Sequence, residues 1–468
     1  MFRRILVANR GEIAARILRT CKEMGIETVA VHSVADAASP HLKLADRTIC
    51  IGPARAADSY LNAGAILQAA EQERCQAIHP GYGFLSENAL FAARCAAHRI
   101  TFIGPEASSI RRMGDKVEAR RTMEAAGLPV IPGSRSALGS VEEAIVEAAE
   151  AGYPVMLKAV AGGGGRGMRR CEDENDLRRA FGEASAEAEA AFGDPSLYLE
   201  KFIKGGRHIE FQILADTYGA AIHLGERECS VQRSHQKLLE EAPSPAITPD
   251  VRARMGALVA KAVSDLGYTG AGTVEFLRDT AGGLHFMEMN TRIQVEHPIT
   301  EEITGVDIVR EQIRIAAGER LGVAQSGIAF EGHAVECRIN AEDPADGFKP
   351  APGTLRAFRI APLPGSGDGK RGRTGAAPRI RVETHVREGT TIPPHYDSLI
   401  AKVIAWGGDR RAALDAMAGA LRGAVIEGVP TTRAFHLEIL EEPGFRSGAY
   451  DTGLVGRMTS QQAARGRR

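Results

Sequence analysis

The sequence predicts an α/β protein, α+β overall, with about three domains. Two stretches support this prediction, because short apolar runs alternate with helical periodicity at the N-terminus and again in residues 131–203. The length of 468 residues is enough for several buried cores, at roughly 150 residues per domain. Hydrophobic residues at 44% and charged residues at 25% match globular proteins and exclude a disordered or fibrous chain.

The N-terminal stretch, residues 1–113, predicts a small doubly wound domain. A strand–helix–strand unit opens the chain, and a unit of this length requires a parallel strand pair with a right-handed crossover. The loop after its first strand carries a single glycine, so the dinucleotide-binding fingerprint is missing and the architecture alone assigns no function. The expected strands are 5–8, 28–31, 77–78 and 101–103.

The second α/β unit is expected around a glycine tract. A strand at 155–160 precedes the tract, a short strand follows at 168–171, and a helix begins near Asp173. Further along, Thr248 followed by Pro249 marks another helix start, because a hydroxyl cap precedes a position that needs no N–H.

Charge and cysteine usage exclude several protein classes. The chain has 58 Lys+Arg and 59 Asp+Glu, and a formal net charge of −1 argues against bulk attraction to nucleic acid. No apolar run approaches the roughly 18 residues of a membrane span, so no membrane partner is expected. The seven cysteines are scattered without zinc spacing, which predicts reduced thiols in a cytoplasmic protein.

The glycine tract at 162–167 formally satisfies GxGxxG, but it has a strand on each side. We interpret it as the tip of a hairpin whose backbone N–H groups could close over phosphates, with a flexible turn as the alternative. Lys158 favours the first reading, because it interrupts an apolar strand where an unpaired ammonium would be costly to bury. It is predicted to be an anion ligand.

Two strand-like runs at 273–277 and 284–288 predict a hairpin in which Glu275 lies directly opposite Glu288. Facing carboxylates repel, so the arrangement needs a cation or a solvated face. Asn290 is two residues beyond Glu288 and points to the same side. Two carboxylates and an amide oxygen suit Mg²⁺ or Mn²⁺ bridging substrate phosphates, whereas a polar outer face of the hairpin is the alternative.

Strict alternation continues beyond Asn290, so that Arg292, Gln294 and Glu296 are expected on its side of a strand. An arginine, an amide and a carboxylate beside a metal suit a small oxyanion, and Glu296 is available as a base. A solvated edge strand is the alternative.

Six motifs together resemble the biotin carboxylase family of the ATP-grasp superfamily, whose members carboxylate biotin with ATP and bicarbonate. The resemblance runs from the N-terminus to about residue 447. The motifs are HPGYGFLSEN (79–88), MGDK (113–116), GGGGRGM (162–168), EMNTRIQVEHP (288–298), GHAVECRINAEDP (332–344) and PPHYDSLIAK (393–402).

The resemblance implies an ATP-grasp fold and a homodimer. Its expected parts are a Rossmann-like pre-ATP-grasp domain at 1–113, an ATP-grasp domain at 114–330 with a mobile glycine-rich lid at 131–203, a C-terminal biotin carboxylase domain at 331–447, and a basic tail at 448–468.

The resemblance also implies roles for individual residues. The expected ATP-binding residues are Lys116, Lys158, Gly164 and Gly165 at the phosphates, Glu200 and Ile203 at the adenine, and His208 and His235 as further contacts. Glu275, Glu288 and Asn290 would bind Mg²⁺ or Mn²⁺. Lys237, Arg292, Gln294 and Val295 would bind bicarbonate, with Glu296 as general base and Arg338 stabilising the biotin enolate.

The chain departs from the family's pattern at several places. Ala161 replaces the first of five lid glycines, Ser234 replaces a usual arginine, and His395 stands where a tyrosine is common. Residues 362–377, rich in glycine and proline without periodicity, are interpreted as a loop insertion in the region of the family's dimer contact.

No biotinyl-lysine motif occurs, so the resemblance implies a free-standing subunit that works with a biotin carboxyl carrier protein and a carboxyltransferase, most commonly for acetyl-CoA. Two other hypotheses remain: another ATP-grasp ligase that joins a carboxylate to an amine, and a non-catalytic paralogue that serves as a scaffold.

Overall fold

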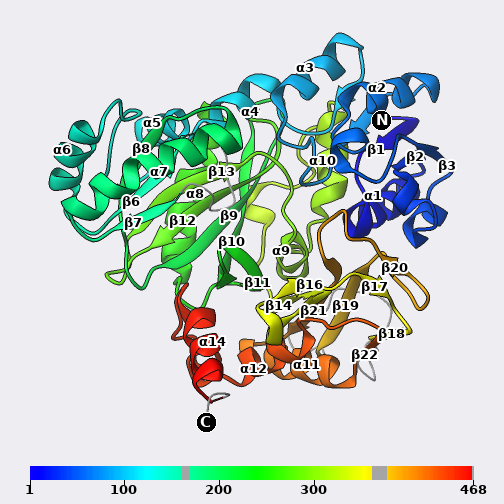
Figure 1. The fold of residues 1–468 in the computed structure, drawn as a ribbon. Helices are drawn as coiled ribbons and strands as arrows, with labels where there is room; N and C mark the ends of the chain where they lie inside the picture. Colours follow the sequence, from blue (N-terminus) through cyan, green and yellow to red (C-terminus); the bar gives the residue numbers. More distant parts are fainter. Residues whose placement is uncertain (161–167, 361–376, 466–468) are drawn as a thin grey trace.

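A computed structural model describes residues 1–160, 168–360 and 377–465. Figure 1 shows the N-terminal part beside a long sheet, called the large sheet below, and a smaller sheet with its helices at the opposite end. The smaller sheet lies within residues 155–201 and is called the lid sheet, after the lid expected there. The predicted glycine tract, with Ala161, Gly164 and Gly165, and the insertion up to residue 376 lie outside the described residues. Within the described ranges no helix is long and apolar enough to cross a membrane.

The N-terminal part confirms the predicted doubly wound unit. Its five strands are parallel in the order β3-β2-β1-β4-β5. Strand β1 pairs with β2, and a crossover helix connects the two in the chain. Ile5 and Val7 pack on one face of this sheet while Leu6 packs on the other, as a buried parallel sheet requires. The elements are β1 (Arg4–Val7), α1 (Gly11–Glu23), β2 (Glu27–His32), β3 (Arg47–Cys50), α2 (Ala63–Gln72), β4 (Ala77–His79), α3 (Ala89–Ala97) and β5 (Thr101–Phe102).

A three-stranded antiparallel sheet, β7-β6-β8, follows the helices α4, α5 and α6 in the chain. The strands on both sides of the glycine tract pair with each other, as predicted, and Asp173 caps the next helix by accepting a hydrogen bond from the N–H of Asp176. The elements are α4 (Ala107–Gly114), α5 (Lys116–Ala125), α6 (Val141–Ala151), β6 (Val155–Ala159), β7 (Arg169–Cys171), α7 (Glu174–Phe192) and β8 (Leu197–Lys201).

The central feature is an eight-stranded antiparallel sheet in the order β13-β12-β9-β10-β11-β14-β21-β19. It is continuous from β13 to β19, because β11 pairs with β14 across the expected domain limit at 330/331. Its strands are β9 (Arg207–Ala215), β10 (Ala221–Arg233), β11 (Gln236–Ala242), β12 (Gly270–Arg278), β13 (Leu284–Asn290), β14 (His333–Asn340), β19 (Arg379–Thr384) and β21 (Leu399–Gly407).

Helices pack against this sheet, and their buried apolar residues form hydrophobic cores with those of its strands. The helix predicted at Pro249 begins there, with the Thr248 hydroxyl accepting from the N–H of Val251. The helices are α8 (Pro249–Asp265), α9 (His297–Thr304), α10 (Ile308–Ala316), α11 (Arg410–Gly423), α12 (Arg433–Glu441), α13 (Pro443–Ser447) and α14 (Leu454–Arg465). In the described C-terminal part, short strands also pair as β15 (Glu342–Asp343) with β16 (Lys349–Pro350), β17 (Gly353–Thr354) with β20 (Thr391–Ile392), and β18 (Ala357–Arg359) with β22 (Val425–Glu427).

The expected basic tail at 448–468 is wrong for most of its length. Residues 454–465 form α14, and Leu454 and Val455 are buried in the core formed by β14, β21 and α11. These apolar residues give the segment an interior face, which the basic residues at its end concealed from sequence reasoning.

Candidate active site

A single cavity of about 1440 Å³ gathers the predicted site residues that the structure describes. It lies where the lid sheet, the large sheet and the N-terminal part meet. Ser234 and His395, which depart from the family's pattern, also line it. The predicted residues in its wall are Lys116, Lys158, Glu200, Ile203, His208, His235, Lys237, Glu275, Glu288, Asn290, Arg292, Gln294, Val295, Glu296 and Arg338.

The predicted carboxylate hairpin is confirmed. β12 and β13 pair antiparallel with Glu275 directly opposite Glu288. The Asn290 side-chain amide donates to the Glu275 carboxylate at 2.8 Å, so these two groups share a side. Glu288 lies 3.0 Å from Lys116 Nζ and its side chain is 38% exposed, against 6% for Glu275. One carboxylate therefore faces the open cavity and the other lies at its floor.

The strand predicted over 290–296 is wrong beyond its first residue. β13 ends at Asn290, and residues 291–296 form neither helix nor strand. Because β13 is the edge of the sheet, the next backbone N–H is free to donate to the Glu87 carboxylate, at 3.0 Å. Gln294 and Glu296 still line the cavity, but through a loop followed by α9 and not through strand alternation.

Arg292 and Gln294 hold this loop against the hairpin. Arg292 donates to Glu87 at 2.9 Å and to the Asn290 side-chain oxygen at 3.0 Å. Gln294 donates to the Glu275 carboxylate at 2.7 Å. The arginine and the amide that were predicted to bind an oxyanion are thus fixed beside the predicted metal ligands.

Two carboxylates lie side by side on the large sheet. Glu210 on β9 is the cross-strand partner of Glu275 on β12 and of Arg227 on β10. Since like charges on neighbouring strands repel, this pair requires cations. Arg227, which is fully buried, donates to Glu210 at 2.5 Å and to Gln294 at 2.8 Å.

Lys237 supplies the second cation. Its Nζ lies 2.6 Å from Glu210, 3.1 Å from Glu275 and 2.6 Å from Glu296. Burial acts to lower the pKa of Lys237, but the three carboxylates outweigh it and raise that pKa well above its ordinary value. Lys237 is therefore a charged centre that links Glu210 and Glu275 to Glu296.

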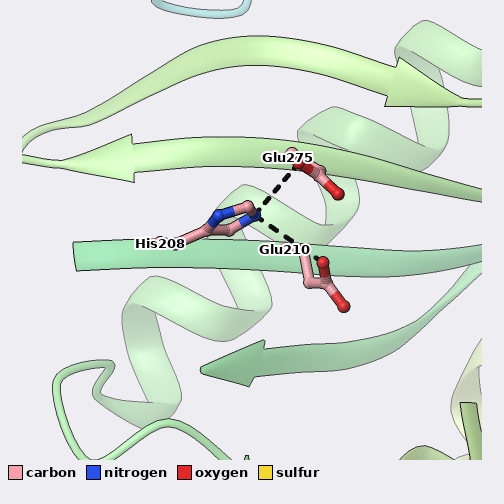
Figure 2. A group of neighbouring side chains, drawn as sticks. All are labelled: His208, Glu210 and Glu275. Atoms are coloured by element: carbon pink, nitrogen blue, oxygen red, sulfur yellow. Dashed lines mark ion pairs between the residues drawn. The ribbon is translucent and has the colours of Figure 1, made fainter. Parts of the chain in front are cut away.

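Figure 2 shows His208 pointing toward Glu210, on the same strand β9, and toward Glu275, on the neighbouring strand β12. Its Nε2 lies 3.0 Å from Glu275 and 3.8 Å from Glu210. Burial opposes the charged imidazolium, but Glu275 raises the pKa of His208 above its ordinary value. The three donor atoms are close enough to hold a metal ion, although Lys237 already contacts both carboxylates.

Glu296 lies between two cations. It is 1% exposed, and its carboxylate accepts hydrogen bonds from Lys237 at 2.6 Å and from Arg338 at 2.9 Å. Burial acts to raise the pKa of Glu296, but Lys237 and Arg338 hold it well below its ordinary value. Arg338 also donates to Glu240 at 2.6 Å, and burial raises the pKa of Glu240 to about 7 despite that bond. Glu296 is thus ionised, and its proton affinity rises when its cations move toward another anion.

The other end of the cavity carries the remaining predicted cations. Lys158 on β6 donates to Glu200 on β8, and Lys116 at the start of α5 faces Glu288. His235 lies in the turn between β10 and β11 with φ of +66°, and burial lowers its pKa. Lys116 therefore lies beside the exposed carboxylate of the hairpin, and Lys158 lines the same cavity.

Sequence reasoning missed Glu210, Arg227, Glu240 and Glu87. One signal was available for Glu210, because His208, Glu210 and Gln212 alternate with apolar residues along β9 and so share a face. The other contacts join residues that are distant in the sequence, and no local pattern marks them.

Comparisons with known proteins cover almost the whole chain. The matching family descriptions are "Biotin carboxylase, N-terminal domain" at residues 1–110, "Carbamoyl-phosphate synthase L chain, ATP binding domain" at 115–324 and "Biotin carboxylase C-terminal domain" at 336–457. The biotin carboxylase of Nostoc sp. is 54% identical over 98% of this chain and 99% of its own length. Biotin carboxylase 1 of Bacillus subtilis is 50% identical over 97% of this chain and 98% of its own.

Solved structures agree with these relatives. The biotin carboxylase domain dimer of Hydrogenobacter thermophilus 2-oxoglutarate carboxylase, in complex with MgADP, ADP and bicarbonate, has a TM-score of 0.91 at 50% identity and 98% coverage of both chains. The Campylobacter jejuni biotin carboxylase, described as a beta-gamma-ATP complex, has a TM-score of 0.92 at 47% identity, covering 98% of this chain and 99% of its own.

Proposed function

The chain belongs to the biotin carboxylase family of ATP-dependent ligases, and on that premise we propose how its residues share the work. The proposed reaction consumes ATP and bicarbonate and transfers the carboxyl group, through carboxyphosphate, to biotin on a carrier protein. The observation that carries the proposal is the buried Glu296 carboxylate, held by Lys237 and Arg338 in the same cavity as the carboxylate hairpin.

The nucleotide would bind at the lid side of the cavity. Lys116 and Lys158 bring positive charge to its phosphates, and their present partners, Glu288 and Glu200, are groups that a metal ion and an adenine amine would engage. Ile203, His208 and His235 line the same cavity and are proposed as further nucleotide contacts. Gly164 and Gly165 join this set by resemblance alone.

The hairpin fits a hard divalent cation. Glu275, Glu288 and Asn290 offer only oxygen donors on paired strands, which is the donor set that Mg²⁺ or Mn²⁺ prefers. These three residues would hold the ion, which supplies charge neutralisation at the phosphates. Lys237 would then release Glu275 and turn toward the substrate anion.

Bicarbonate would bind at Lys237, Arg292, Gln294 and the Val295 backbone, beside Glu296. As the anion draws Lys237 away, Glu296 gains proton affinity and removes the bicarbonate proton. The oxygen so freed attacks the γ-phosphorus of ATP and ADP leaves, with Lys116 and Lys158 neutralising charge that develops on the phosphoryl oxygens.

Carboxyphosphate then breaks down to CO₂ and phosphate. The phosphate removes the ureido proton of biotin, and the enolate nitrogen attacks CO₂ to form the new C–N bond. We propose that Arg338 stabilises the negative charge of the enolate; its guanidinium lines the cavity, 2.9 Å from Glu296, and this supports the assignment. Exclusion of water matters, because carboxyphosphate hydrolyses.

We further propose that the carrier is a separate biotin carboxyl carrier protein and that the chain works as a homodimer. A carboxyltransferase would complete an acyl-CoA carboxylase, with acetyl-CoA as the first acceptor to test. The homodimer is supported by the Hydrogenobacter thermophilus domain, which is a dimer, and the reaction by relatives named biotin carboxylase. A chain 51% identical to this one is named 2-oxoglutarate carboxylase small subunit, so the acceptor needs its own test. Affinity capture followed by identification of the biotinylated partner and its carboxyltransferase supplies that test.

A cytoplasmic location is part of the same proposal. All seven cysteines are free thiols, and six of them are buried, which suits a reducing compartment.

The direct test is ADP release measured with free biotin, with and without bicarbonate. Stimulation by bicarbonate supports carboxylation of biotin. ADP release that needs an amine and a different carboxylate, and ignores bicarbonate, would instead indicate a carboxylate–amine ligase that shares the lysines and the metal hairpin. No ADP release under any of these conditions would favour a scaffold role.

A further inference from the structure

A buried lysine outside the proposed mechanism lies against the segment that carries the base. Lys402 on β21 has a side chain with 0% exposure. Its Nζ donates to the Val295 carbonyl oxygen at 2.7 Å and lies 3.1 Å from the Glu12 carboxylate. A buried ammonium is costly unless it is paired and hydrogen-bonded, so these contacts define where it sits.

The segment that Lys402 contacts has little backbone support of its own. Residues 291–296 form neither helix nor strand, although they hold the proposed bicarbonate ligands and the base. At one end of the segment Glu87 accepts the first backbone N–H. Near the other end, Lys402 satisfies the carbonyl oxygen of Val295, directly before Glu296. Side chains therefore do here what ladder hydrogen bonds do within a strand.

The lysine also joins three distant parts of the chain. Glu12 lies in the first turn of α1 and accepts a hydrogen bond from the Tyr82 hydroxyl at the cavity wall. Across the large sheet, Lys402 is the cross-strand partner of Arg338, which contacts the Glu296 carboxylate. One residue on β14 thus fixes the side chain of Glu296, while its neighbour on β21 fixes the backbone that carries it.

We propose that Lys402 is a positioning residue for the carboxylation reaction. Its ammonium holds the Val295 carbonyl and so places Glu296 and the Val295 backbone against bicarbonate. This role rests on the proposed function, because it assumes that bicarbonate binds at this segment. It predicts that loss of the ammonium acts on the use of bicarbonate and spares ATP binding, whose proposed lysines lie on other elements.

The test compares the parent, a double variant and a matched control, so that loss of the Lys402 bond to Val295 is separated from the cost of an unpaired Glu12 carboxylate. Lys402→Met alone would leave the buried Glu12 carboxylate without its cation, so the decisive variant combines Lys402→Met with Glu12→Gln. The matched control is Glu12→Gln alone, which keeps the ammonium and its bond to Val295. In that control Lys402 still has Glu383 as its cross-strand neighbour on β19. Melting temperatures show whether each variant folds, and activities are compared well below the lowest midpoint.

The expected result is a split between the two substrates. In the double variant, kcat/KM for bicarbonate falls by about tenfold or more, since small misplacements of a reacting group cost one to two orders of magnitude. KM for ATP stays within about twofold, and the Glu12→Gln control stays within about threefold of the parent in every constant. Amide hydrogen exchange across residues 291–297 becomes faster in the double variant but not in the control.

Two outcomes separate the proposals from each other. A parent chain without bicarbonate-dependent ADP release overturns the proposed function, and hydrogen exchange then still tests whether Lys402 orders the segment. A parent that is active, with a folded double variant of equal bicarbonate kcat/KM and unchanged exchange, overturns the role of Lys402 alone.

Discussion

Replacing Glu296 by glutamine removes the proposed base while keeping the shape of the side chain. Glutamine accepts one of the two hydrogen bonds of Glu296 through its amide oxygen, whereas its NH2 group faces the other donor, so one of the bonds from Lys237 and Arg338 is lost. Proton transfer by a positioned carboxylate contributes about 10²- to 10⁴-fold, and we expect kcat of Glu296→Gln to fall by that factor. Binding of ATP should change little, because no proposed ATP ligand contacts Glu296 in the part of the chain that the structure describes.

The contacts of Glu296 also set the stability of this variant. Stranding a buried ionic partner costs about 3–5 kcal/mol. Here neither cation is stranded, because Lys237 keeps Glu210 and Glu275 while Arg338 keeps Glu240. We therefore expect the free energy of unfolding to change by less than about 2 kcal/mol.

The assay is bicarbonate-dependent ADP release at saturating ATP, combined with urea unfolding of the same preparations. Glu301→Gln is the matched control, because Glu301 is also 1% exposed but pairs with Arg16 and Arg381 outside the cavity. It should lose stability while kcat of the folded enzyme stays within about threefold. A Glu296→Gln variant with kcat within about threefold of the parent would refute the assignment of the base.

Three further predictions follow from the site and the sheet. Glu288→Lys places a cation opposite Lys116 at the proposed metal hairpin and should reduce turnover to about 1% or less while the chain stays folded. The control Glu118→Lys reverses an equally exposed carboxylate outside the cavity and should keep full turnover. Activity retained in Glu288→Lys would show that the metal assignment is wrong. Chelation by EDTA should abolish bicarbonate-dependent ADP release and added Mg²⁺ should restore it, whereas release that persists after exhaustive chelation would contradict an oxygen-ligated metal. Burial opposes ionisation of Glu241, but His333 and Arg410 hold its pKa at about 2. The ionised form therefore stabilises the fold by about 3 kcal/mol above the unfolded-state pKa of 4.5, and this stabilisation is lost as pH falls from 4.5 toward 2. In urea unfolding between pH 5 and pH 2, Glu241→Gln should lose less stability than the parent, and parallel curves would contradict the low pKa of Glu241.

Local patterns were sufficient for the features that depend on neighbours in the sequence. The register of Glu275 and Glu288 follows from the two-residue period of strands and a short turn between them, and the structure confirms it. Asp173 and Thr248 cap helices where their side chains predict it. Each of these depends on fewer than about 20 consecutive residues.

Features set by the sheet's edges and by distant partners could not be read in this way. Alternation continues past Asn290 in the sequence, but the strand ends there because it lies at the sheet edge and Glu87 takes the next N–H. Arg227 binds Glu210 only because β9 and β10 are neighbours in the fold. The role of Lys237 as the shared cation of three carboxylates likewise depends on strands brought together by folding.

The domain limits and the assigned roles of the individual site residues stay predictions. The continuous eight-stranded sheet joins the regions on both sides of residue 330, so limited proteolysis near that position tests whether they separate as units. Substitution of each cavity residue, followed by measurement of bicarbonate-dependent ADP release, tests the role assigned to it.

The central claim is that the chain forms a C–N bond between bicarbonate carbon and biotin at the expense of ATP. Carbon-labelled bicarbonate, ATP and biotin incubated with the chain, followed by separation of the acid-labile carboxybiotin, measures this bond directly. We predict label in biotin that requires ATP and is lost in Glu296→Gln. ATP hydrolysis without labelled biotin, or labelling that does not depend on ATP, would contradict the account.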